Sequence, residues 1–431
     1  MVGGTTRSTK QVVYECRGPR GSRARRSTCS SRVVGSRFPD VGTYFVGFRR
    51  GCVIGAIVVA AGVSACTSEP SDPPPAASVA ATATSLSSAM SAELDTAIQD
   101  AMEAGSVRGA IVAIKTPQGR FVGAHGRPGT EEGLEMDPAM TTRIGSITKT
   151  FTVTAVLQLV DEGKLGLDDP IGDYLPGVPN GDTITIRHLA GMRSGLPDYT
   201  SDPDFRIAYG LHPEAGWQPD QLLTYAFADP VLFEPGERFH YSSTNTILLG
   251  QLIEKISGTT LPDYLATKIL VPVGLSETSL PNDATLPEPH MRGYSASTET
   301  TAWNPTYGWA AGGMVSTVDD LGRWAQAIAD GSLLSAETQQ ARLDFQPTDD
   351  PTFGYGLGLV KHDGWIYHQG SMPGYQTFAG YHPDAEVVLV IAINTDHAAY
   401  VDGKDFVPVD LFAEAVTTIV TPESPFTAVP I

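Results

Sequence analysis

Beyond residue 66 this 431-residue chain contains no cysteine, because its four cysteines are Cys16, Cys29, Cys52 and Cys66. The body of the chain therefore has no disulfide and no thiolate metal site. It is also poor in positive charge: residues 1–65 hold 11 Lys and Arg against 2 Asp and Glu, which leaves 18 against 46 for the remainder. A surface this acidic repels nucleic acid, so a DNA or RNA partner is excluded.

Three motifs that identify other enzyme classes are missing. The nine histidines show no H-E-x-x-H and no paired-ligand spacing, which argues against a zinc hydrolase. No P-loop is present, and GYGLG at 354–358 leads into a strand-like run rather than a helix, which argues against a nucleotide enzyme. The G-x-S-x-G of α/β-hydrolases is absent as well. We expect neither a metal ion nor an organic cofactor.

Residues 1–66 are predicted to comprise an N-terminal extension followed by a lipoprotein signal peptide. The apolar run CVIGAIVVAAGVSAC at 52–66 follows Arg49 and Arg50 and ends in small residues. It is shorter than the roughly 20 residues that a membrane span needs. Its last four residues resemble a bacterial lipobox, which predicts lipidation of Cys66 and a domain held outside the cytoplasmic membrane. Plain cleavage and an uncleaved anchor are the alternatives.

The rest of the chain divides into a tether and one domain. Residues 67–89 are rich in Pro, Ala and Ser and predict a flexible tether, and a domain is expected over 90–425. Within it, residues 140–345 are mostly helical and loop-like. Helical patterns at 90–105 and 410–420 enclose strand-like runs at 109–115, 120–126, 355–361, 364–368, 377–382 and 386–394. These patterns predict an α+β fold, in which strands from both ends form one antiparallel sheet flanked by terminal helices, with the helical region inserted.

The segment RIGSITKTFT at 143–152 places Ser146 and Lys149 three positions apart. On a helix these two side chains share a face and can touch. The following FTVTAVLQLVDEG is apolar on nearly every side, which predicts a buried helix. A lysine in the first turn of such a helix is costly unless it is paired or used. Taken alone, however, the pair is better explained as a capping serine beside a snorkelling lysine.

Other segments favour a catalytic role for this pair, because together with RIGSITKTFT they match the motifs of a known family in the same order along the chain. They are GKLGLDDPIGDYLP at 163–176, ITIRHLAGMRSGLPDY at 184–199, PGERFHYSSTNTILLGQLIEKISG at 235–258, AAGGMVSTVDDLGRWAQAI at 310–328 and HQGSMPGY at 368–375. With them, residues 90–420 resemble the serine β-lactamases and D-alanyl-D-alanine carboxypeptidases. The resemblance is to the class C β-lactamase-like branch, which also holds penicillin-binding proteins, esterases and D-amino-acid peptidases. It implies the β-lactamase/transpeptidase-like fold and a serine hydrolase.

The resemblance also implies roles for individual residues. Ser146 matches the nucleophile of the family, and Lys149 matches the lysine that activates it. Tyr241 matches the tyrosine of the Tyr-x-Asn motif, and a phenol becomes a base only where a cation stabilises its phenolate. Lys149 and Tyr241 are therefore expected to act as a coupled pair, with the proton acceptor left open. Ser243 occupies the position of the substrate-binding Asn, so that contact is in doubt, and Asn245 is expected to begin the next helix.

The third motif of the family matches His368, Gln369 and Gly370 on an edge strand. A histidine there can be charged or neutral near pH 7 and so modulate the base. Gly370 would let the backbone of a substrate lie close to the strand, beside Gln369. The backbone N–H groups of Ser146 and Ser371 would form the oxyanion hole.

The substrate stays open at this point, because a D-Ala-D-Ala peptide, a β-lactam and an ester all place a carbonyl over the same nucleophile. The predicted location near peptidoglycan favours a D-alanyl-D-alanine carboxypeptidase or a related cell-wall peptidase. A class C-like β-lactamase, an esterase, or a penicillin-binding sensor with little turnover are the alternatives. The expected partners are thus a small-molecule or peptide substrate and, through the lipid at Cys66, the membrane.

Overall fold

The computed structural model describes residues 84–130 and 133–431, which belong to one unit, Ser78–Ile431. The predicted export signal, Cys66 and the tether up to residue 83 lie outside the described residues. The last residues of the predicted tether are part of the fold, since Ser85 bridges to Arg120 and the side chain of Leu86 is buried. Within the described part of the chain, no helix has both the length and the apolar character needed to cross a membrane.

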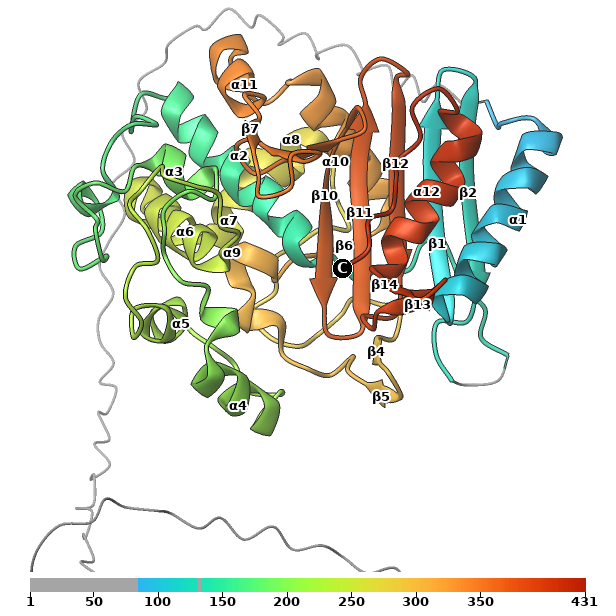
Figure 1. The fold of residues 1–431 in the computed structure, drawn as a ribbon, viewed down its shortest axis with the longest axis horizontal. Helices are drawn as coiled ribbons and strands as arrows, with labels where there is room; N and C mark the ends of the chain where they lie inside the picture. The colour runs from blue at the N-terminus through green and yellow to red at the C-terminus, as the bar shows by residue number, and fades with distance from the viewer. Residues whose placement is uncertain (1–83, 131–132) are drawn as a thin grey trace, which may run out of the picture. The chain divides into compact units, whose positions relative to one another are not determined.

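An eight-stranded antiparallel sheet forms the core of the domain, in the order β2-β1-β12-β11-β10-β9-β8-β7. Figure 1 shows that strands from the two ends of the chain lie side by side in it. The bounds of its strands are β1 Gly109–Thr116, β2 Gly119–Gly126, β7 Gln346–Pro347, β8 Gly354–Tyr355, β9 Val360–His362, β10 Trp365–Met372, β11 Tyr375–His382 and β12 Val387–Ile393. The expected sheet built from both termini is therefore confirmed.

Two terminal helices cover one face of this sheet. Helix α1 (Ser88–Gly105) begins two residues earlier than its pattern predicted, because the Ser87 side chain accepts a hydrogen bond from the backbone N–H of Met90. It packs beside α12 (Pro408–Val420), as Figure 1 shows. Their apolar faces meet a layer of sheet residues that includes Trp365, Tyr367 and Phe378, and together these form one of the two hydrophobic cores.

The inserted helical region lies against the other face and one end of the sheet (Figure 1). Two of its helices, α2 and α6, position the site. The second hydrophobic core lies between these helices and the sheet. The helices are α2 Thr148–Asp161, α3 Ile186–Ala190, α4 Pro203–Leu211, α5 Pro219–Ala226, α6 Ser243–Ser257, α7 Leu261–Leu265, α8 Val271–Val273, α9 Trp309–Gly312, α10 Val318–Asp330 and α11 Ala336–Arg342, with the 3-10 turns η1 Gly145–Ile147, η2 Ile171–Asp173, η3 Tyr199–Ser201 and η5 Pro305–Tyr307 and the π-helical turn η4 Ala266–Leu270. Two short strand pairs complete it, β3 Thr142–Arg143 with β6 Val315–Ser316 and β4 Tyr294–Ser295 with β5 Thr298–Glu299. A third pair, β13 Ala399–Val401 with β14 Lys404–Phe406, follows β12 near the C-terminal end.

The prediction of one strand over 355–361 is wrong. The chain makes two short strands there, β8 and β9, which pair with each other as a hairpin. The turn between them needs Gly358, whose φ is +73°, a backbone conformation that favours glycine. A hydrogen bond of 2.9 Å from the N–H of Gly356 to the carbonyl of Leu359 closes this turn.

Candidate active site

The nucleophile candidate lies on a tight turn held against the sheet. Ser146 sits in η1, directly before α2, and the preceding Gly145 has a φ of +49°. A side chain at Gly145 would come within 2.5 Å of the backbone nitrogen of Ser371 on β10. The hydroxyl of Thr377 on β11 donates to the carbonyl of Ile144 at 3.0 Å, which ties the turn to the sheet. Ser146 is thus carried by a rigid junction of turn, helix and sheet.

Lys149 lies one turn along on α2, and its side chain is buried. Its Nζ atom is 3.0 Å from Ser146 Oγ and donates to the carbonyl of Ala311 at 2.8 Å. Burial lowers the pKa of Lys149 to about 7, although the negative charge of Asp198 acts in the opposite direction. A substantial fraction of this amine is therefore neutral near pH 7, and a neutral amine can accept a proton from the serine.

Tyr241 faces the same amine. Lys149 Nζ lies 4.9 Å from the centroid of the Tyr241 ring, within the range of a cation–π contact. Burial raises the pKa of Tyr241 far above its usual range, although a hydrogen bond with Ser146 acts against this. The sequence left open whether Lys149 or Tyr241 accepts the proton. The lowered pKa of Lys149 makes it the easier of the two to deprotonate, while the phenol of Tyr241 keeps its proton.

His368 completes the group from the sheet side, with its ring 6.1 Å from that of Tyr241. Its Nδ1 is 2.6 Å from the carbonyl oxygen of Gln369, an acceptor, so Nδ1 carries the proton. Burial, and then the charge of Lys149, lower the pKa of His368 to about 3. The imidazole is consequently neutral near pH 7. Its Nε2 faces the hydroxyl of Tyr355 at 3.4 Å, a contact that the sequence did not predict.

The strand that carries His368 offers an open edge beside the nucleophile. Strand β9 pairs with β10 only from Trp365 to Tyr367, so the stretch from His368 to Met372 pairs with β11 alone. A side chain at Gly370 would come within 1.9 Å of the carbonyl oxygen of Ile144, so only glycine allows this approach. The third motif was predicted to lie on an edge strand, and in β10 the unpaired edge is limited to residues 368–372.

Gln369, which was predicted to bind substrate, lines the cavity described below, and its side-chain amide donates to the carboxylate of Asp410 in the first turn of α12. The neighbouring Gln376 on β11 accepts a hydrogen bond from the N–H of Val409 at 3.2 Å. Two glutamines thus tie the start of α12 to the strands of the site. Burial raises the pKa of Asp410 to about 7, although the hydrogen bond from Gln369 lowers it.

Ser243 and Asn245 lie on α6, behind Tyr241. Helix α6 begins at Ser243, two residues before its predicted start at Asn245. Asn245 is buried, and its side-chain oxygen accepts a hydrogen bond from the hydroxyl of Ser194 at 2.5 Å. Ser243 is nearly buried and lies outside the set of residues that line the cavity described next.

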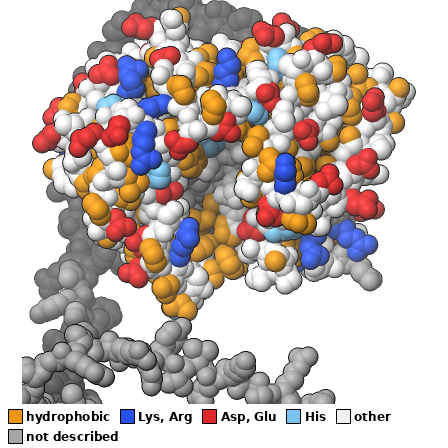
Figure 2. Space-filling model, viewed as in Figure 1, with side chains coloured by type: hydrophobic (Ala, Val, Ile, Leu, Met, Phe, Trp, Pro, Cys, Tyr) orange, Lys and Arg blue, Asp and Glu red, His pale blue; other side chains and the backbone are white. Residues whose placement is uncertain are grey.

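A cavity of about 590 Å³ opens over these groups. Figure 2 shows the face of the domain hollowed near its centre, with apolar side chains in the hollow and acidic side chains scattered around it. The residues that line the cavity are Ser146, Phe239, Tyr241, Thr348, Phe353, Tyr355, Val360, Tyr367, His368, Gln369, Gly370, Ser371, Gln376, Asp396, Ala398, Val407, Val409 and Ile431. It therefore joins the predicted nucleophile, tyrosine, histidine and oxyanion donor in one space.

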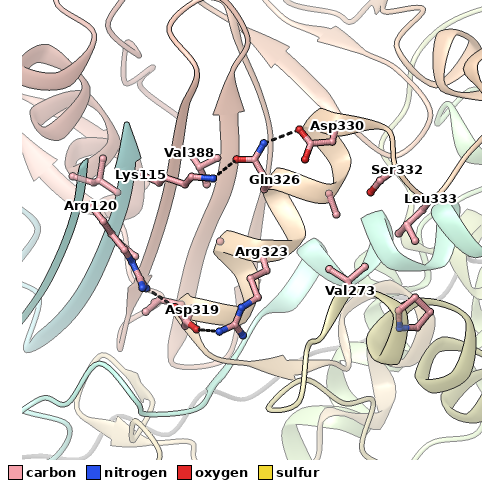
Figure 3. A pocket seen from close by; sticks show the side chains of 16 residues that line it. Lys115, Arg120, Val273, Asp319, Arg323, Gln326, Asp330, Ser332, Leu333 and Val388 are labelled. Carbon is pink, nitrogen blue, oxygen red and sulfur yellow. Dashed lines mark hydrogen bonds and ion pairs between the residues drawn. The ribbon is translucent and has the colours of Figure 1, made fainter. Parts of the chain in front are cut away.

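A second cavity, of about 600 Å³, lies between α10, α8 and the β1–β2 end of the sheet and contains none of these groups. Figure 3 shows that its charged side chains are bound to one another or to Gln326. Arg120 and Arg323 both pair with Asp319, while Lys115 donates to Gln326 at 2.9 Å. Across residues 84–130 and 133–431, no three His, Cys, Asp or Glu side chains gather in a way that could hold a metal ion.

Comparison with known proteins identifies relatives of this fold. A model of the Beta-lactamase family matches residues 94–410. Penicillin-binding protein 4* of Bacillus subtilis (strain 168) is 30% identical over 330 residues, which cover 70% of this chain and 71% of that protein. For three curated relatives, the matched region spans between 62% and 71% of their length.

Solved structures show the same likeness in three dimensions. A D-stereospecific amidohydrolase from Streptomyces sp. superposes with a TM-score of 0.65 at 32% identity, over 71% of this chain and 94% of that chain. The D-amino acid amidase from Ochrobactrum anthropi SV3, complexed with L-phenylalanine amide, gives a TM-score of 0.67 at 25% identity, over 77% of this chain and 99% of that chain. The predicted β-lactamase/transpeptidase-like fold is confirmed.

Proposed function

The chain belongs to the beta-lactamase family of serine hydrolases, and we propose that it hydrolyses peptide or amide bonds of D-amino acids through an acyl-enzyme on Ser146. One observation carries this proposal: the buried amine of Lys149 lies 3.0 Å from Ser146 Oγ, and its pKa is lowered to about 7. A serine hydroxyl is a weak nucleophile until a base within hydrogen-bond reach takes its proton. Lys149 meets both the geometric and the protonation requirement.

In the proposed acylation, neutral Lys149 accepts the Oγ proton while Oγ bonds to the carbonyl carbon of the substrate. The backbone N–H groups of Ser146 and Ser371 donate to the oxygen that becomes negative. The bond to the leaving nitrogen then breaks, and this nitrogen takes a proton from the Lys149–Tyr241 pair. In deacylation the same pair accepts a proton from water, which attacks the ester, and Oγ regains a proton as the acid leaves.

The D-amino-acid substrate class is supported by the names of the similar structures, a D-stereospecific amidohydrolase and a D-amino acid amidase. The D-alanyl-D-alanine carboxypeptidase or cell-wall peptidase expected from the sequence is one member of this class. A β-lactam or an ester would present its carbonyl to the same serine. A penicillin-binding module that acylates with little turnover is the alternative to an enzyme of this class.

Intact-mass spectrometry tests the proposal. The chain is mixed separately with a β-lactam, a D-alanyl-D-alanine peptide, a D-amino acid amide and an ester, and product release is followed in parallel. We expect turnover of at least one substrate, or a mass increase equal to its acyl group, and loss of both in Ser146→Ala. Ser332→Ala, a serine that lines the second cavity, is the matched control. A persistent adduct without product supports the sensor, and identical behaviour of wild type and Ser146→Ala rejects the nucleophile.

We also propose that a lipid on Cys66 holds the domain outside the cytoplasmic membrane. The support is the sequence alone, the basic and apolar order of residues 49–66 with its lipobox-like end. Incorporation of a labelled fatty acid tests it. We expect labelling of the full chain and its loss in Cys66→Ala, while equal labelling of both would reject the anchor.

A further inference from the structure

Asp396 is placed where it can set the charge of the substrate. It follows β12 and lines the cavity over Ser146. Among the described residues that line this cavity, Asp396 has the one acidic side chain, His368 is neutral near pH 7, and no lysine or arginine belongs to the lining. Lys149 lies beneath this surface, bonded to Ser146 and Ala311.

One oxygen of the Asp396 carboxylate is not hydrogen-bonded. Its Oδ1 atom is buried and has no hydrogen-bond partner. The carboxylate therefore lacks a favourable interaction at this oxygen, and a cationic group of a ligand in the cavity would offset its negative charge. The acids of the second cavity contrast with it, since Asp319 and Asp330 are both bonded to neighbouring side chains.

The strand that precedes Asp396 ends close to the reacting centre. Ser371 pairs with Gln376 on β11, and Gln376 pairs with Ile393 on β12, so these residues line up across three strands. Because neighbouring strands lie about 4.8 Å apart, Ile393 is about 10 Å from Ser371.

The next residue, Asn394, is buried and anchors this strand end. Its side chain accepts from the N–H of Gly109 at 2.8 Å and donates to the carbonyl of Arg127 at 3.1 Å. Asp396 therefore follows a strand end that is tied to β1 and lies within the length of a short peptide or a lysine side chain from the oxyanion donor.

We propose that Asp396 selects substrates that carry an ammonium group near the scissile bond, and that the cavity disfavours substrates with a free carboxylate there. This inference rests on the proposed function and narrows it, within the D-amino-acid class, toward amides and peptides with a free amine. A carboxypeptidase must hold the carboxylate of its substrate, and a described lining that contains the Asp396 side chain and no lysine or arginine opposes that charge. The excess of acidic over basic residues outside residues 1–65 adds a long-range attraction for cationic substrates.

A charge series with one reacting amide tests the proposal. D-alanine 4-nitroanilide carries a free ammonium, its N-acetyl derivative is neutral and its N-succinyl derivative carries a carboxylate, while an Nα-acetyl-D-lysine anilide places the ammonium farther away. We expect kcat/KM to fall from cationic to neutral to anionic substrate, by roughly 10- to 100-fold at the first step, since a hydrogen bond to a charged group has about that effect. In Asp396→Asn the kcat/KM values of the cationic, neutral and anionic substrates should become similar. Asp402→Asn, an exposed acid of the β13–β14 turn, should preserve it.

Binding to Ser146→Ala separates this inference from the proposed function. The non-chromogenic methylamides of the same series are titrated by calorimetry into Ser146→Ala and into Ser146→Ala combined with Asp396→Asn. Tighter binding of the cationic member that depends on Asp396 supports the charge selection even where wild type shows no turnover, an outcome that would reject the proposed function alone. Equal kcat/KM and equal binding across the series, or an order that survives Asp396→Asn, would overturn the inference while leaving the hydrolase proposal intact.

Discussion

The two cavities of this domain have nearly the same volume, about 590 and 600 Å³, and differ in what their polar groups contact. In the cavity of Figure 3 the charged side chains are partly exposed and satisfy one another, as Arg120 and Asp319 do. In the cavity over Ser146, burial shifts the pKa of Lys149 and of His368 far below their usual values. Volume therefore does not identify a reactive site, whereas titratable groups held away from water do. Matched substitutions at the two cavities, compared by their effect on activity and stability, test this difference.

The largest effect is expected from replacing the same residue type in each cavity. Lys149→Met removes the amine beside Ser146 and should lower the rate of acylation by about 10²- to 10⁴-fold, the range for loss of a positioned base. The fold should survive, because the methionine fills a similar buried volume. Lys115→Met removes an amine of the second cavity and should leave the rate unchanged. Stopped-flow acylation and circular dichroism measure both, and an acylation rate near wild type in Lys149→Met would reject the role of the lysine.

A smaller effect concerns pH and separates the lysine from the histidine. The pKa of Lys149 is about 7, so the neutral amine fraction, and with it acylation, should fall about tenfold per pH unit below that value. His368, with a pKa of about 3, loses no proton between pH 5 and 9. His368→Asn should therefore lower the rate without moving the midpoint of the acidic limb. Acylation rates measured from pH 5 to 9 check this, and loss of the limb in that variant would assign it to the imidazole instead.

The sequence predicted the residues of this site that belong to short motifs and missed others that lie beside them. Ser146, Lys149, Tyr241 and His368 could be found because each belongs to a short motif of a known family, and the structure brings them around one cavity. Their approach depends on the order of the strands, which no local pattern encodes.

Tyr355, Asp396 and Asp410 have no such motif. Each reaches the site through strand or helix contacts between segments far apart in the chain, such as the pairing of β11 with β12. The error at 355–361 has a local cause, since an apolar run with two glycines is compatible with one strand or with a hairpin, and only the positive φ of Gly358 decides between them.

Asp410 offers a test on stability at the border of the active cavity. Its pKa in the folded state is about 7, above the usual value of 3.8, so the folded state holds a proton that the unfolded state releases. The free energy of unfolding should consequently decrease as pH rises from about 4 to about 7, with the full penalty present above 7. Asp410→Asn keeps an acceptor for Gln369 but cannot ionise, so it should gain a few kcal/mol relative to wild type at pH 8 and little at pH 4.

Thermal melts at several pH values measure this difference, with Asp405→Asn, an exposed acid of β14, as the control. The control should follow the pH dependence of wild type. Parallel curves for wild type and Asp410→Asn would mean that the carboxylate is already ionised at pH 5 in the folded protein.

The smallest effect is expected in the cavity of Figure 3. Asp319→Asn removes the charge that pairs with Arg120 and Arg323, but these side chains are between 39% and 50% exposed, and Arg323 keeps its bond of 2.8 Å to Asp320. Exposed ion pairs contribute about 0–1 kcal/mol, so the free energy of unfolding should change by no more than that and kcat/KM should stay within about twofold. Chemical denaturation and steady-state kinetics measure both quantities. A large loss of activity would mean that this cavity communicates with Ser146, because no described lining residue is shared between the two spaces.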